Sequence, residues 1–352
     1  MTLVSTVKDG IFRLARQAGV MSLVRQSGWR RRRLLILCYH GISIDDEHEW
    51  NPALYMRQDV FRRRLAALAR SNQVLSLDEG LRRLHDGTLP NAAVAITVDD
   101  GAFDFYARAW PVLEELSLPA TVYQTTYYAE NNRPVFDTFA SYLLWKARTR
   151  RIDLSSLVAL EGAQDLSQGS VRDAVHVALM DLAQRDSLDA ERKDALLESL
   201  ADLLDVDIAA LRATRILHLM TPAEIAELAA RGIDFQLHTH RHRTPDDAAE
   251  FAREIDDNRQ RIETLTHRTA NHFCYPSGVY REMYLRWLRD ANVLSATTCD
   301  PGMATVESPS LLLPRLVDTM GLSDLTFEAW SSGVAELLPR RTRRGSGASV
   351  FA

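Results

Sequence analysis

The sequence predicts an α/β protein: a distorted (β/α) barrel of about seven parallel strands with a helical insertion. Seven short apolar runs rich in branched residues lie along the chain, as expected of strands buried on both faces. Helical patterns separate several of these runs, and such alternation is typical of a parallel sheet. The predicted strands span residues 34–39, 93–98, 120–125, 233–237, 272–275, 293–298 and 312–317.

Five amphipathic stretches predict the helices that cover this sheet. In residues 246–266, for example, Phe251, Ile255 and Ile262 recur at helical spacing and form an inward stripe. The other helices are predicted at residues 59–70, 103–116, 281–291 and 322–338.

Residues 137–220 break the alternation. Their apolar residues, such as Val175 and Leu179, follow a helical stripe, and no strand is evident among them. The region ends at Thr221-Pro222-Ala223-Glu224, which has the pattern of a capping box for the next helix. We therefore expect a barrel over residues 34–338 that is interrupted by a helical insertion at 137–220.

The two ends of the chain are basic. Residues 1–33 hold eight Lys and Arg against one acid in an amphipathic pattern interrupted at Gly10 and Gly19. Such a segment is expected either to attach to an anionic membrane surface or to pack on the barrel with a solvated charge run. Residues 339–352 are predicted to be a disordered tail. Because the net charge is −5, the rest of the chain is strongly acidic, which argues against a nucleic acid partner.

Cysteine usage and hydropathy bear on the compartment. The three cysteines, Cys38, Cys274 and Cys299, lack CxxC spacing and predict buried free thiols in a reducing compartment. The apolar run at 34–38 is far shorter than the ~20 residues that span a bilayer, and too short for a signal peptide. We expect a cytoplasmic protein, either free or membrane-associated.

The second predicted strand runs directly into Asp99-Asp100-Gly101. Adjacent acids on an extended chain point in different directions, so one can bind a metal ion while the other faces a water molecule. Gly101 allows a tight turn into the following helix. An ordinary strand–helix turn with an Asp cap is the alternative interpretation.

A histidine cluster follows another predicted strand. His238, His240 and His242 lie within five residues, and His238 and His242 can converge on one cation if the chain turns. One carboxylate and two imidazoles make a three-ligand site that leaves positions open for water, whose pKa the metal lowers to about 7. The second carboxylate is then free to act as a general base.

These motifs resemble the polysaccharide deacetylase superfamily, the NodB-homology domain of carbohydrate esterase family four. Its first motif, Thr-Phe-Asp-Asp-Gly, is similar to Thr97-Val98-Asp99-Asp100-Gly101, and its second, His-Ser/Thr-x-x-His, to His238-Thr239-His240-Arg241-His242. A third, Arg-x-Pro-x-Gly after a Phe, corresponds to Phe273-Cys274-Tyr275-Pro276-Ser277-Gly278. The resemblance covers residues 34–320 without the insertion. It implies a barrel that hydrolyses an N-acetyl or similar N-acyl group on a polysaccharide or glycan precursor.

The resemblance also implies roles for single residues. Asp99 would be the base that takes a proton from metal-activated water. Asp100, His238 and His242 would hold one divalent metal ion, with zinc as the default. The turn at Tyr275 and Ser277 would contact the substrate, with the backbone N–H of Ser277 helping to hold the oxyanion.

Two departures from the family pattern matter. Cys274 replaces the arginine of the third motif, as in the Phe-x-Tyr-Pro-x-Gly branch typical of exopolysaccharide deacetylases, and Arg315 is a candidate to brace Asp99 instead. Residues 312–318 lack the histidine that supplies the general acid in the family. His40 is the best substitute, with a structural histidine as the alternative; His267 and His272 are weaker candidates.

Three functions stay open on the sequence alone. The first is the deacetylase, whose substrate would be an N-acylated glycan or a lipid-linked sugar. The second is a non-catalytic carbohydrate-binding or assembly protein on the same scaffold, which the absent acid favours. The third is a metal phosphoesterase, although a single carboxylate with two histidines binds only one metal ion.

Overall fold

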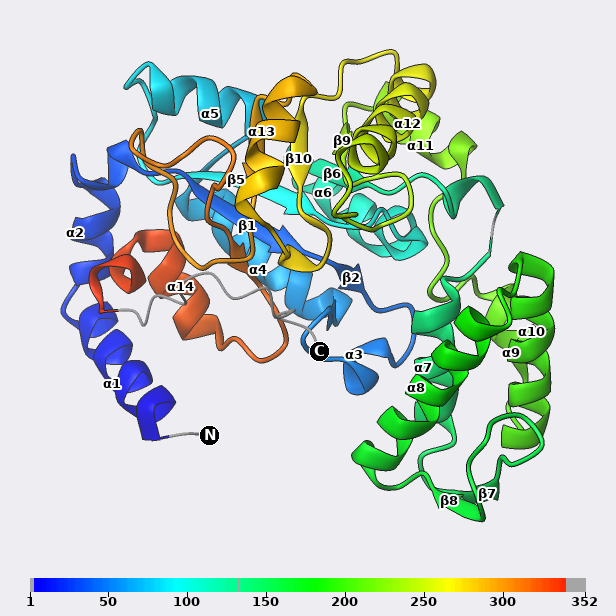
Figure 1. Ribbon diagram of the computed structural model, residues 1–352. Helices are drawn as coiled ribbons and strands as arrows, with labels where there is room; N and C mark the ends of the chain where they lie inside the picture. The colour runs from blue at the N-terminus through cyan, green and yellow to red at the C-terminus, as the bar shows by residue number, and fades with distance from the viewer. Residues whose placement is uncertain (1–2, 132, 340–352) are drawn as a thin grey trace.

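The computed structural model describes residues 3–131 and 133–339. At its centre lies a sheet of parallel strands wrapped by helices (Figure 1). The strands are β1 (Leu35–Tyr39), β4 (Gln73–Leu75), β5 (Ala93–Val98), β6 (Thr121–Gln124), β9 (Asp234–Leu237), β10 (His272–Cys274), β11 (Ser295–Thr297) and β12 (Leu316–Val317). Their order is β11-β10-β9-β6-β5-β1-β12, and β4 pairs with the first half of β5.

The segment that leads into β12 closes the sheet. Leu313 pairs in parallel with Thr297 of β11, whereas Leu316 pairs with Leu37 of β1. The single strand predicted at 312–317 is thus divided between the two edges of the sheet. The predicted barrel is confirmed, and β4 lies outside the seven predicted strands.

Helices on the outside of the barrel follow the predicted stretches with local differences, and α5 (Leu77–His85) lies outside all of those stretches. A π-helical turn at Phe105–Ala109 precedes α6 (Trp110–Glu115). Helix α14 (Asp324–Ser332) ends before Gly333, whose φ of 100° breaks the helix expected to run to residue 338. Helix α11 (Pro222–Ala230) begins at the predicted capping box, in which Thr221 and Glu224 bond each other's backbone N–H. The helices are α4 (Gln58–Ser71), α5 (Leu77–His85), α6 (Trp110–Glu115), α11 (Pro222–Ala230), α12 (Ala248–Thr266), α13 (Glu282–Asp290) and α14 (Asp324–Ser332).

Residues 136–213 form a helical lobe, at the lower right of Figure 1, with its own hydrophobic core. Tyr142 and Trp145 are buried in that core and so pack rather than face solvent. One expectation was wrong here, because two short antiparallel strands, β7 (Arg151–Asp153) and β8 (Ala163–Asp165), lie in the lobe. The helices are α7 (Phe136–Lys146), α8 (Gly169–Arg185), α9 (Ala190–Leu204) and α10 (Ile208–Ala213).

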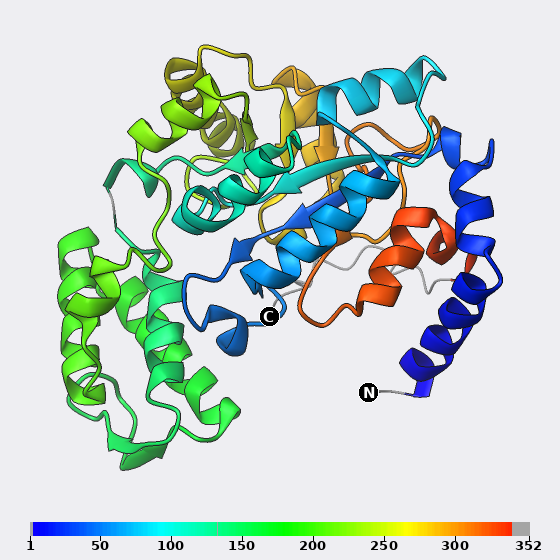
Figure 2. The same cartoon turned by 180° about the vertical axis from the view of Figure 1, so that it is seen from behind.

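Two N-terminal helices, α1 (Leu3–Gln17) and α2 (Val20–Gln26), pack along α14, as the view from behind shows (Figure 2). Gly10 does not interrupt α1, but Gly19, with a φ of 72°, separates the two helices. Among the helices of the described residues, none has the length and apolarity needed to cross a membrane. The tail predicted to be disordered lies, from residue 340 on, outside the described residues.

Candidate active site

The predicted site residues follow the carboxyl ends of four parallel strands. His40 follows β1, Asp99 and Asp100 follow β5, His238 follows β9, and Tyr275 follows β10. In a parallel barrel all strand ends of one kind lie at the same rim, which is where such folds place their chemistry.

Asp100, His238 and His242 converge at this rim. The Nε2 atoms of His238 and His242 lie 3.0 and 3.2 Å from Oδ1 of Asp100. Nδ1 of His238 donates to the carbonyl oxygen of Cys274 at 2.9 Å, which leaves the lone pair of Nε2 facing Asp100. Two imidazoles and a carboxylate, with one atom of each within 4.8 Å of the others, are a donor set that fits a divalent metal ion with open positions.

The backbone is strained where it presents these ligands. Asp100, Thr239 and His242 have φ of 69°, 61° and 54°, a region that side chains other than glycine rarely adopt. Gly101 has a φ of 77°, and a Cβ there would lie 2.1 Å from the side chain of Gln124. The turn after β5 therefore requires glycine at position 101.

A buried carboxylate holds the histidine loop in place. Glu254 of α12 accepts hydrogen bonds of 2.8 Å from both the Arg241 backbone N–H and Nε of Arg243. Burial alone would raise the pKa of Glu254, but these donors lower it. The sequence indicates that Glu254 is buried, because it lies beside Phe251 and Ile255 on the inward stripe of the helix.

The middle histidine of the cluster turns away from the metal ligands. Nδ1 of His240 lies 2.8 Å from the hydroxyl of Thr126, and its ring is buried. His240 therefore has a structural place in the loop.

Arg315 binds both oxygens of Asp99, with two nitrogen–oxygen distances of 2.7 Å. The guanidinium is fully buried and also donates to the carbonyl oxygen of Thr298 at 2.9 Å. Burial would raise the pKa of Asp99, but Arg315 outweighs it and holds the pKa of that carboxyl well below its usual range. Asp99 is therefore ionised at neutral pH. Because the Arg315 guanidinium already occupies both of its oxygens, Asp99 is unsuited to hold a metal ion as well.

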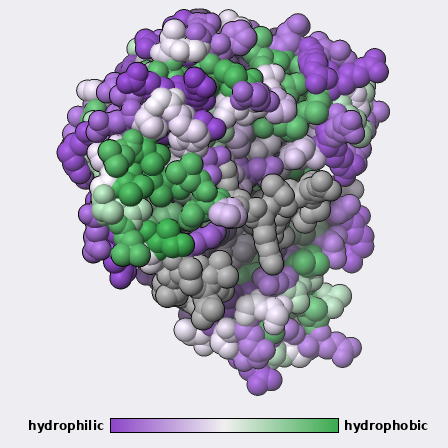
Figure 3. Space-filling view, turned by 90° about the vertical axis from the view of Figure 1, so that its left-hand side faces the viewer, coloured by the Kyte–Doolittle hydropathy of each residue, from purple (hydrophilic) through white to green (hydrophobic). Residues whose placement is uncertain are grey.

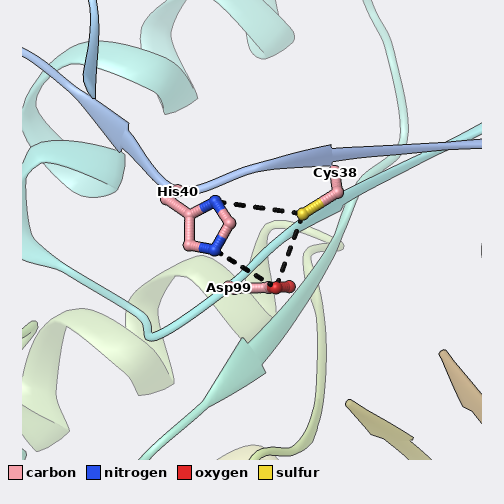
Figure 4. Close-up of side chains that lie close together, drawn as sticks. All are labelled: Cys38, His40 and Asp99. Carbon is pink, nitrogen blue, oxygen red and sulfur yellow. Dashed lines mark hydrogen bonds and ion pairs between the residues drawn. The ribbon is translucent and has the colours of Figure 1, made fainter. Parts of the chain in front are cut away.

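The other side of Asp99 faces Cys38 and His40 (Figure 4). Nε2 of His40 lies 3.7 Å from Oδ2 of Asp99, and the sulfurs of Cys38 and Cys274 lie 3.5 and 3.3 Å from the same oxygen. Burial raises the pKa of both thiols, so they stay protonated and donate to the carboxylate. These thiol contacts were not expected from the sequence. Cys299 is half-buried, and it is therefore more accessible than the sequence predicts.

A general acid must be protonated, but the surroundings of His40 oppose this. A neighbouring carboxylate is present, but burial lowers the pKa of His40 more than Asp99 and Asp100 raise it. The imidazole is therefore neutral at neutral pH. The weaker candidates lie elsewhere: His267 caps the end of α12, and His272, at the opposite rim, bonds the hydroxyl of Ser295.

The turn after β10 presents its backbone rather than its tyrosine. The Tyr275 side chain is buried, and its hydroxyl donates to the carbonyl oxygen of Leu311 at 2.9 Å. The phenol is thus not available to a substrate, and the predicted substrate contact of this turn stays a prediction for its backbone. Ser277 is exposed in a left-handed conformation with φ of 55°.

A cleft of about 230 Å³ opens beside the metal-ligand group. Asp100 and His242 line it, and so do Asp137 and Thr138 of α7. The helical lobe therefore contributes to the lining of the space in front of the site. The other lining residues are Tyr55, Ala102, Thr125, Tyr128, Val135, Leu217, His218, Leu219 and Arg241.

The polysaccharide deacetylase family model matches residues 86–167 and 189–295, more than half of the chain. The chain is therefore a member of the polysaccharide deacetylase family. Its barrel, with two acids and two histidines at the strand ends, agrees with this match. The matched residues include Asp99, Asp100, His238 and His242 but neither His40 nor Arg315.

Solved structures support the same fold. The Streptococcus pyogenes deacetylase PplD, in complex with acetate, aligns with a TM-score of 0.56 at 18% identity, over 87% of this chain and 99% of that chain. IcaB from Ammonifex degensii aligns with a TM-score of 0.53 at 16% identity, over 86% and 97% of the two chains.

The chain also matches a short part of a longer relative in sequence. The poly-beta-1,6-N-acetyl-D-glucosamine N-deacetylase of Escherichia coli K12 is 29% identical over 102 residues, which are 28% of this chain and 15% of that protein.

Proposed function

We propose that the protein is a metal-dependent hydrolase that removes an N-acetyl or similar N-acyl group from a polysaccharide or glycan precursor. The observation that carries the proposal is the convergence of Asp100, His238 and His242 beside an ionised Asp99. Two imidazoles and a carboxylate favour zinc but also accept cobalt, nickel, manganese or iron. A divalent ion bound there would polarise the amide carbonyl and acidify a water molecule.

Asp99 is the proposed base, and Arg315 orients its carboxylate for the proton of the attacking water. The low pKa of Asp99 makes it a ready proton donor once it is protonated. His40, neutral and 3.7 Å away, is placed to accept that proton and deliver it to the leaving amine. The backbone N–H of Ser277 is the proposed donor to the oxyanion.

The substrate class is proposed from the cleft and the relatives. The Escherichia coli relative is named for poly-β-1,6-N-acetylglucosamine, so polymers of N-acetylglucosamine are the first substrates to test. Lipid-linked N-acylated sugars are the second. The open cleft beside the lobe suits a chain of sugars better than an enclosed pocket would.

Metal content and acetate release from a panel of N-acetylated glycans test the proposal together. One divalent ion per chain is expected, with acetate release that stops on chelation and returns with zinc. Glycan binding without any acetate release would instead support a non-catalytic carbohydrate-binding protein, the alternative that the absence of a histidine in residues 312–318 favours. Phosphate release from phosphoesters alone would favour a phosphoesterase.

A further inference from the structure

The outward face of α1 and α2 exposes large apolar side chains. Leu14 and Leu23 are 67% and 71% exposed, and Ile11 and Val20 are 41% and 37% exposed. Figure 3 shows a continuous hydrophobic surface on the side of the molecule where these two helices lie. An apolar surface of this kind on one side of a protein marks an interaction site.

The opposite face of the same helices is fixed to the barrel. Phe12 and Met21 are buried in the main core, where α1 and α2 pack on α14. Beyond α2, the buried Arg30 donates to the carbonyl oxygen of Ala93 at 3.0 Å and ties the segment to the start of β5. The exposed residues therefore project from helices that are packed on the barrel, and none of the described residues covers them.

Basic side chains surround this apolar surface. Lys8, Arg13 and Arg16 are exposed on α1, and Arg31 and Arg32 are exposed just beyond α2. Asp9 is the one acid among residues 1–33. A cavity of about 780 Å³ next to α2 is lined by Trp29, Arg31, Arg32 and Arg33 of this segment, together with residues from elsewhere in the chain that include Glu307.

We propose that the face formed by α1 and α2 docks on the surface of an anionic lipid bilayer. Leu14 and Leu23 enter the acyl boundary, and the basic rim lies among the phosphate headgroups. A second copy of the chain fits this face poorly, because two basic rims would meet. The inference goes beyond the proposed deacetylase activity and does not depend on it.

Vesicle flotation of the full chain tests the proposal. Binding is expected to vesicles of phosphatidylcholine with phosphatidylglycerol, to weaken in high salt, and to be absent with phosphatidylcholine alone. The double variant L14E/L23E should weaken binding by about tenfold or more, because two apolar anchors are lost. The charge variant K8E/R13E should weaken it by about tenfold as well.

Val177→Glu is the matched control, because Val177 is 55% exposed on α8, far along the chain from this face. It should bind vesicles as the wild type does. All variants change exposed residues, so their unfolding temperature and acetate release from soluble oligosaccharides should match the wild type. The proposal is wrong if the wild type ignores anionic vesicles, if L14E/L23E binds them normally, or if the face instead dimerises the protein.

Discussion

Asp99 and Asp100 are neighbours in sequence with different surroundings. Arg315 and two thiols enclose Asp99, whereas Asp100 faces the imidazoles of His238 and His242. The positive φ of Asp100 turns its side chain away from that of Asp99. This separation supports a division of labour in which one acid binds metal and the other moves protons.

Replacing Asp99 with Asn should lower turnover by roughly 10²–10⁴-fold, since it keeps the shape and removes the base. Metal content should remain at the wild-type level, because the ligands are untouched. Turnover on an N-acetylated oligosaccharide and metal analysis of the purified variant measure the two effects. Asp100→Asn is the control that should lose metal. Normal turnover in Asp99→Asn would refute the mechanistic assignment.

Replacing His40 with Ala should lower turnover without expelling the metal ion. The pH–rate profile should also change, because the group that passes the proton to the leaving amine is gone. His267→Asn is a suitable control, as His267 has a left-handed conformation that Asn tolerates and lies at the end of α12. If His40→Ala turns over normally, His40 is structural and another group supplies the proton.

His242 predicts how pH acts on the metal-free protein. Burial lowers the pKa of His242, but the charge and hydrogen bond of Asp100 outweigh it and raise the pKa above 6.5. The stabilisation from this pair is therefore fully present below pH ~6.5 and is lost as pH rises through the raised pKa. The unfolding temperature of the metal-free chain should fall over that range.

His242→Gln should remove this component of the pH dependence and lower metal affinity. Metal binding by the wild type should release a proton, since a ligating imidazole must be neutral. Calorimetry in buffers of different ionisation enthalpy measures that release. If the metal-free wild type and metal-free His242→Gln have the same unfolding temperature at every pH, the assignment is contradicted.

At the scale of elements, buried strands were predictable and exposed ones were not. Every residue of β1 and β5 is buried, which produces the continuous apolar runs seen in the sequence. β4, β7 and β8 are three residues long and contain no fully buried residue, so they leave no such run. The contacts of the Cys38 and Cys274 thiols with Asp99 join distant segments, which no local pattern encodes.

The helical lobe is expected to shape the cleft for a particular glycan, and Thr138 of α7 tests this. Thr138→Trp should fill part of the 230 Å³ cleft and raise KM for polymeric substrate several-fold, with metal content unchanged. Release of acetate from a monosaccharide should change less, and Thr138→Val should behave as the wild type. Equal effects on polymer and monosaccharide, or none on either, would exclude the proposed role.

At the scale of the whole molecule, the barrel followed from the alternation of strands and helices. The sequence of residues 1–33 predicts either a membrane contact or packing on the barrel, and the structure gives α1 and α2 each a packed face and an exposed face. The N-terminal segment can thus pack on the barrel with one face and leave its apolar outer face available for binding. The cytoplasmic location and the disordered tail stay predictions.

The closing segment has a consequence for how activity arises. The contact between Arg315 and Asp99 spans 216 residues, and Arg315 lies on the stretch that joins the two edges of the sheet. During synthesis the ribosome releases Asp100, His238 and His242 before Arg315. A nascent chain would thus be able to gather its metal ligands before its base is oriented, and hydrolysis would begin only when the last strand is in place.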